Sequence, residues 1–223
     1  MHLSDFRTFR TFGLFIMNGF YIYASMLKKA ALLLISVLFL LTAKAQSADS
    51  VYNQYLDFNL ARFQGQQDKA FVLGENLVPL ADKLPEKARI SFYFAVGKLY
   101  EDDGQPEKAL PFYEKVAAAV PEYYVVHRAL GYLYLDKAKA IEDKLSLPAK
   151  NTAATDSLKA AYLAMVRKTL PHLEKAQACD PSDDTLYIIK GLYTKINDSQ
   201  GLATLNDRLK QLAAGCIDVL SDN

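Results

Sequence analysis

The sequence has few of the side chains from which catalytic and metal sites are built. Its 223 residues include three histidines and two cysteines. His2 lies in the N-terminal leader, and His127 and His172 have no Cys, Asp or Glu at ligand spacing. Glycine-rich phosphate loops, nucleophile elbows and paired metal motifs are missing as well. These absences argue against an enzyme and against a bound cofactor or metal ion.

A strong charge of either sign is also missing. The whole chain has a formal net charge of +1. Residues 1–45 carry five basic side chains and one acidic side chain, so residues 46–223 keep 21 basic and 24 acidic ones, a net charge of −3. A weakly acidic body has no phosphate-binding footprint. We therefore expect neither a nucleic acid partner nor a basic membrane-surface domain.

Residues 26–45 have the pattern of a secretory signal peptide. Two lysines follow Met26, an apolar run covers residues 30–42, and an A-x-A cleavage site ends at Ala45. The run is shorter than the about 20 residues that a membrane-spanning helix needs. We expect cleavage after Ala45 and a periplasmic or secreted protein of residues 46–223. The alternative is an uncleaved leader that anchors the protein in the membrane.

Residues 1–25 precede this leader, although a signal peptide normally begins its chain. They contain a second apolar stretch over residues 11–25. We interpret residues 1–25 as a mis-called start, with translation beginning at Met26. If they are translated, they lengthen the hydrophobic leader and favour retention in the membrane.

Residues 90–122 combine two stretches of helical periodicity with a turn at Gly104–Pro106 between them. Gly97 lies within the apolar stripe of the first stretch, where a missing side chain lets a neighbouring helix approach closely. Glycine costs about 1 kcal/mol relative to alanine inside a helix, so we expect a packing role. The positions that define the pattern are Tyr93, Val96, Gly97, Tyr100, Ala109, Tyr113 and Pro121.

The order and spacing of these residues resemble the tetratricopeptide repeat, aromatic-x2-Leu-Gly-x2-Tyr followed by Ala-x3-Phe and Pro. The pattern recurs 34 residues later at Leu130, Gly131 and Tyr134, although His127 replaces the aromatic residue. The resemblance implies an all-α protein, a short right-handed solenoid of about four helix-turn-helix hairpins. The hairpins must stack, because one hairpin cannot cover its own apolar face.

The expected hairpins cover residues 51–85, 90–121, 124–181 and 183–220. The first lacks the small residue pair and is interpreted as a capping repeat. The third contains an insertion at residues 139–160, because the motif Leu-Pro-x-x-Glu-Lys at residues 110–115 recurs 60 residues later. The fourth follows Pro181, has its glycine at Gly191, and ends in a helix that runs to about Leu220.

The resemblance also implies where a partner binds. In tetratricopeptide arrays the first helices of the hairpins line a concave groove that takes extended or helical peptides. The matching positions are Phe94, Lys98, Glu101, Arg128, Tyr132 and Leu135, with Ile188, Leu192 and Lys195 as weaker candidates. The alternative is that Phe94, Tyr132 and Ile188 pack against neighbouring hairpins or the insertion. Family members that clamp a peptide carboxylate use an asparagine that these positions lack, so we do not carry that activity over.

Cys179 and Cys216 are the only cysteines, and export would place them in an oxidising compartment. We expect them near the ends of neighbouring second helices. A disulfide needs Cα atoms within about 7 Å, whereas equivalent points on packed helices are commonly about 8–10 Å apart. A disulfide that pins the last hairpin and two buried free thiols therefore both stay open.

These observations predict an exported, non-catalytic scaffold that binds a protein or peptide. One alternative is an envelope-complex subunit that an uncleaved leader holds in the membrane. Another is an enzyme with a site in the insertion, where Glu142, Asp143 and Asp156 have no obvious partner.

Overall fold

A computed structural model describes residues 49–148 and 152–220 of the chain. The chain divides into two compact units, residues 1–53 and 54–223. In the first unit, the described residues 49–53 are helical. The leader and its cleavage site lie outside the described residues. None of the helices that the structure describes is long and apolar enough to cross a membrane.

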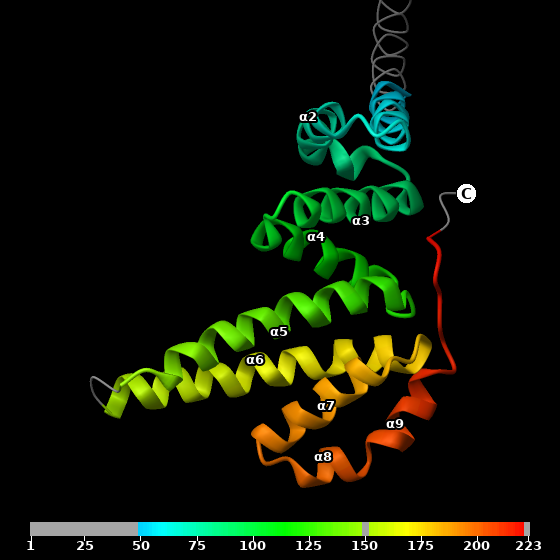
Figure 1. Cartoon of the computed structure of the whole chain (residues 1–223). Coiled ribbons are helices and arrows are strands. Elements are labelled where there is room, and N and C mark those ends of the chain that lie inside the picture. Colours follow the sequence, from blue (N-terminus) through cyan, green and yellow to red (C-terminus); the bar gives the residue numbers. More distant parts are fainter. Residues whose placement is uncertain (1–48, 149–151, 221–223) are drawn as a thin grey trace, which may run out of the picture. The chain divides into compact units, whose positions relative to one another are not determined.

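The regular elements in the described part of the second unit are helices (Figure 1), which confirms the predicted all-α class there. Its first helical segment ends at Phe63. The elements that follow are α2 (Gln67–Leu77), the 3-10 helix η1 (Val78–Lys83), α3 (Glu86–Asp102), α4 (Pro106–Ala119), α5 (Tyr124–Ser146), α6 (Thr152–Cys179), α7 (Asp183–Lys195), α8 (Ser199–Ala203) and α9 (Leu205–Leu212).

Turn residues set the helix boundaries where the sequence indicated them. Gly104 adopts a left-handed φ of 70° after α3, and Pro106 is the first residue of α4. At the start of α7 the Ser182 side chain accepts a hydrogen bond from a backbone N–H of the first turn. Asp198 caps α8 in the same way, with 2.7 Å between its Oδ1 and the backbone nitrogen of Gly201.

Each helix from α3 to α7 packs on the next, and α6 also packs on α9. The most extensive contact joins α5 and α6. These two helices have 23 and 28 residues, whereas α3 and α4 have 17 and 14. An insertion that lengthens both helices of one hairpin gives this difference in length.

Two glycines bring paired helices close together. A Cβ atom at Gly97 would lie 2.6 Å from the Tyr113 ring, and one at Gly131 would lie 2.6 Å from the Leu173 side chain. Leu173 follows Tyr113 by 60 residues, the shift at which the Leu-Pro-x-x-Glu-Lys motif recurs. The same contact therefore occurs once between α3 and α4 and once between α5 and α6.

A tyrosine hydroxyl on the first helix of a pair also meets a glutamate on the α-helix that ends the preceding pair, and this occurs three times. The glutamates lie on α2, α4 and α6, and the tyrosines lie on α3, α5 and α7. In α7 the tyrosine Tyr193 follows Gly191 by two positions, whereas in α5 the tyrosine follows its glycine by three. The repeat pattern therefore missed Tyr193. The three hydrogen-bonded pairs are Tyr100 with Glu75, Tyr134 with Glu114, and Tyr193 with Glu174.

Two expectations for the last hairpin are wrong. A Cβ atom at Gly191 would meet no atom within 4 Å, so this glycine does not serve a close helix contact. The final helix does not run to Leu220, because the chain divides into α8 and α9 and α9 ends at Leu212. The buried Lys175 ammonium donates to the Leu212 carbonyl at 3.1 Å, which satisfies one of the acceptors that the helix leaves open at its end.

The two glycine environments predict opposite effects of adding a methyl group. Gly131→Ala should lower the free energy of unfolding by about 1–3 kcal/mol, because the methyl group would collide with Leu173. Gly191→Ala should raise it by up to about 1 kcal/mol, because the space is open and alanine favours the helix. Urea denaturation of the two variants measures both changes. Equal shifts in the same direction would contradict the helix contact at Gly131.

Candidate functional site

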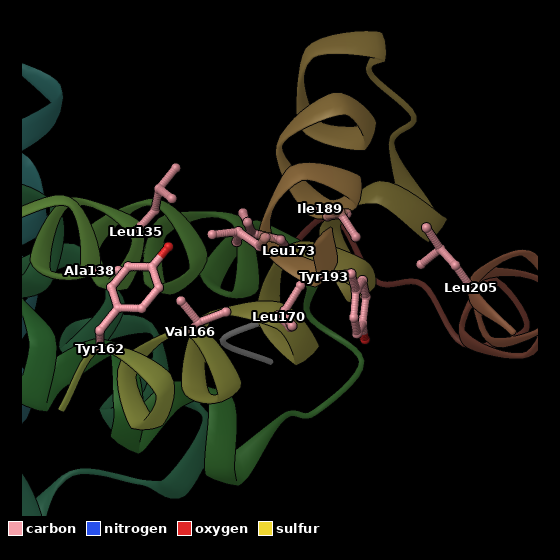
Figure 2. Close-up of a cluster of buried hydrophobic side chains, with 10 residues drawn as sticks. Leu135, Ala138, Tyr162, Val166, Leu170, Leu173, Ile189, Tyr193 and Leu205 are labelled. Carbon is pink, nitrogen blue, oxygen red and sulfur yellow. The ribbon is translucent and has the colours of Figure 1, made fainter. Parts of the chain in front are cut away.

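Helices α5, α6 and α7 enclose an apolar groove of about 640 Å³. Its floor continues into a buried cluster that joins the three helices (Figure 2). Residues of α5 and α7 make up most of the lining, α6 contributes Tyr162, and the missing side chain of Gly191 leaves space in the groove. The main floor residues are Leu135, Ala138, Tyr162, Ile188, Gly191 and Leu192.

One polar atom in the groove lacks a partner. The Tyr162 side chain is 9% exposed, and its hydroxyl has no hydrogen-bond partner among the described residues. Burial raises the pKa of Tyr162, with a further rise from the Glu142 carboxylate that Lys195 opposes. The hydroxyl therefore stays neutral. A buried polar group without a hydrogen-bond partner costs about 1–3 kcal/mol. A ligand group that forms a hydrogen bond with this oxygen therefore gains affinity.

An ion pair crosses the rim of the groove. The Lys195 ammonium of α7 lies 2.6 and 2.8 Å from the two carboxylate oxygens of Glu142 on α5. The two side chains are 52% and 40% exposed, so the pair contributes only about 0–1 kcal/mol. A ligand can part these side chains at little cost. Tyr187, 80% exposed, stands at the edge and offers an aromatic surface.

The three groove residues predicted on α3 are engaged within the protein. The Phe94 ring packs against the rings of Tyr113 and Tyr123, with centroids 5.7 and 5.1 Å apart. The Lys98 ammonium lies 3.6 Å from the Glu101 carboxylate. Glu101 also accepts a hydrogen bond from the Tyr113 hydroxyl at 2.7 Å. Phe94 therefore packs within the protein, as the alternative interpretation predicted, and it also lines a small cleft beside residues 218–220.

The three groove residues predicted on α5 have different surroundings. Arg128 pairs with Asp180, and the Tyr132 hydroxyl lies 2.9 Å from the hydroxyl oxygen of Thr185 on α7. Both contacts tie α5 to the segment that follows α6. Leu135 is the only one of the six predicted positions that lines the groove. The three weaker candidates on α7 line it too: Ile188, Leu192 and Lys195.

Sequence reasoning missed the groove residues that lie near the insertion. Ala138 and Glu142 follow Leu135 at helical spacings of three and seven, so they share its face of α5. That spacing was a signal in the sequence, but it pointed to a groove only once α7 was known to lie opposite. Glu142, which had no partner in the sequence, pairs with Lys195 in the structure. Tyr162 carried no pattern that would have placed it there.

The cysteines form a disulfide, Cys179–Cys216, with Cα atoms 5.6 Å apart. The free-thiol alternative assumed that both residues lie on packed helices. Cys179 is the last residue of α6, but Cys216 lies beyond the end of α9 in an extended segment. An extended segment can approach a helix end more closely than a second helix can, because it is thinner.

The two histidines of the described chain meet at the contact between α5 and α6. Their Nδ1 atoms lie 2.9 Å apart, so one ring donates a proton and the other accepts it. Burial, together with repulsion from His127 and Lys168, lowers the pKa of His172 to about 4. Burial also lowers the pKa of His127. Among the described residues, no three His, Cys, Asp or Glu side chains gather as they would at a metal site.

The chain was compared with models of known families, with curated proteins and with solved structures, and it matched none of them. The tetratricopeptide assignment therefore stays a prediction.

The histidine pair predicts that the folded state weakens in mild acid. Below pH 6.5 the histidines of the unfolded chain bind protons, whereas the partly buried His172 of the folded state does not do so until about pH 4, and the pKa of His127 is lowered as well. The contribution of the histidine pair to the free energy of unfolding is thus fully present above pH 6.5. About 1–2 kcal/mol of this contribution should be lost by pH 5. Urea denaturation between pH 7 and 5 measures the loss. The double variant His127→Phe, His172→Phe removes both rings, and parallel profiles for the two proteins would contradict the role of the pair.

Proposed function

We propose that this protein is a non-catalytic helical scaffold of tetratricopeptide type that binds a protein partner in the groove between α5, α6 and α7. The observation that carries the proposal is the apolar groove itself, with the buried hydroxyl of Tyr162, which has no hydrogen-bond partner in the described part of the chain. Binding sites are typically concave and apolar, with a few polar groups that fix the ligand. The groove has this composition.

The repeated contacts support a tandem-repeat origin for the scaffold. The glycine contact occurs in two successive helix pairs, and the tyrosine–glutamate hydrogen bond that joins one pair to the next occurs three times. Contacts that recur at equivalent positions are expected when one hairpin has been copied along a chain. The disulfide and the leader of residues 26–45 together support export, because disulfides persist in oxidising compartments.

The shape and charge of the groove favour an amphipathic helix as the bound segment. An amphipathic helix binds an apolar groove through one face, on which apolar side chains recur at helical spacing. The rim carries three lysines, Lys139, Lys190 and Lys195, against the single carboxylate of Glu142. A helix with acidic residues beside its apolar face would therefore meet opposite charge, and it would compete with Glu142 for Lys195.

The groove can be filled without disturbing the core. Gly191→Leu places a side chain in open space on the groove floor, and Asp184→Leu adds the same side chain to α7 away from the groove. When residues 46–223 are used to capture proteins from an extract of the producing cells, Gly191→Leu should reduce retention of the specific partner by about tenfold or more, about 1.4 kcal/mol. Quantitative mass spectrometry measures the captured proteins.

The control variant Asp184→Leu should retain the partner as the unaltered protein does. If all three proteins capture the same set in equal amounts, the partner does not use the groove. Substitutions at Arg128 and Tyr132 are less suitable tests, because these side chains hold α5 to Asp180 and Thr185 within the protein.

A further inference from the structure

After α9 the chain turns back in an extended segment (Figure 1), and residues 216–220 of this segment are here called the tail. The tail pairs with the residues that precede α5. The Tyr124 nitrogen donates to the Ile217 carbonyl at 3.1 Å, and the Ile217 nitrogen donates to the Glu122 carbonyl at 2.8 Å. The two bonds form an isolated parallel bridge between Tyr123 and Ile217. An extended peptide is thus bound here through its main chain.

The start of the tail is held firmly. Cys216 is bonded to Cys179 at the end of α6. The buried Lys175 ammonium donates to the carbonyls of Leu212 and Gly215, just before the tail. These contacts fix the position of the chain immediately before Ile217.

The end of the tail fits its surroundings less well. Val219 is 71% exposed, and a cleft of about 270 Å³ stays open between residues 218–220 and the helical residues 55–63. Phe94 and Ser91 of α3 also line this cleft. The Ser91 hydroxyl is buried and has no hydrogen-bond partner among the described residues. The tail therefore leaves both apolar surface and a polar atom unused.

We propose that the surface beside residues 122–124, together with the adjoining cleft, binds an extended peptide and that the tail is the tethered, displaceable occupant of this surface. An incoming segment would pair with residues 122–124 in the place of the tail, as in recognition by strand addition. Its side chains would follow the order of the tail, in which the acidic Asp218 lies between the apolar Ile217 and Val219. This surface lies apart from the groove of α5, α6 and α7, and the inference does not depend on the proposed function.

The disulfide decides how strongly the tail competes. With Cys216 fixed beside α6, Ile217 is the next residue, and a tether this short gives an effective concentration in the millimolar range or above. A free peptide with the same contacts is outcompeted at ordinary concentrations. Removal of residues 217–223 should expose the surface, whereas the disulfide and the Lys175 contacts would remain.

The experiment compares the intact protein with a variant that ends at Cys216. The probe is a fluorescein-labelled synthetic peptide of residues 217–223, and fluorescence polarisation measures its binding. The shortened protein should bind the peptide saturably, and the intact protein should bind it at least about tenfold more weakly. A peptide with aspartate in place of Ile217 and Val219 should not bind either protein. Circular dichroism establishes that the shortened protein is folded.

Two results would overturn the inference. One is a folded, shortened protein that does not bind the peptide, and the other is equal binding by the shortened and the intact protein. Gly191→Leu in the shortened protein should leave peptide binding unchanged, because Gly191 lies in the other groove. A loss of binding in that variant would assign the peptide to the groove and would likewise overturn the inference.

Discussion

The close approach of α5 and α6 is the contact on which the rest of the structure depends. It is possible because Gly131 has no side chain where the Leu173 side chain and backbone lie against it. The two helices hold the partly buried histidines His127 and His172 between them, and α7 and α9 both pack on α6. A wider separation of α5 and α6 would disturb each of these contacts, because protein interiors are close-packed.

Unequal helix length creates the groove. The 13 residues of α7 are far fewer than the 23 of α5 and the 28 of α6. The apolar residues Leu135, Ala138 and Tyr162 therefore face a space that α7 only partly fills, and Gly191 leaves it open. The extended tail also results from a short helix, in this case α9. Because α9 ends at Leu212, the chain reaches Cys216 and the residues before α5 in an extended form.

The sequence pattern succeeded where local rules decide the outcome. Gly104 and Pro106 ended one helix and began the next, and the close approach of a neighbouring helix at Gly97 followed from the spacing of apolar and small residues. It failed in the last hairpin. Gly191 has the spacing of a packing glycine, but the second helix of that hairpin is broken into α8 and α9, so no helix lies against it.

The sequence by itself determined the all-α class, most helix boundaries and the helix pairs that meet at Gly97 and Gly131, because these depend on residues close together in the chain. Only the tertiary structure decided that Lys195 meets Glu142 across a groove and that Cys216 reaches Cys179. Both contacts join residues that are 37 or more positions apart. Such contacts depend on where a helix stops and where the following chain is directed, and no short-range periodicity records that.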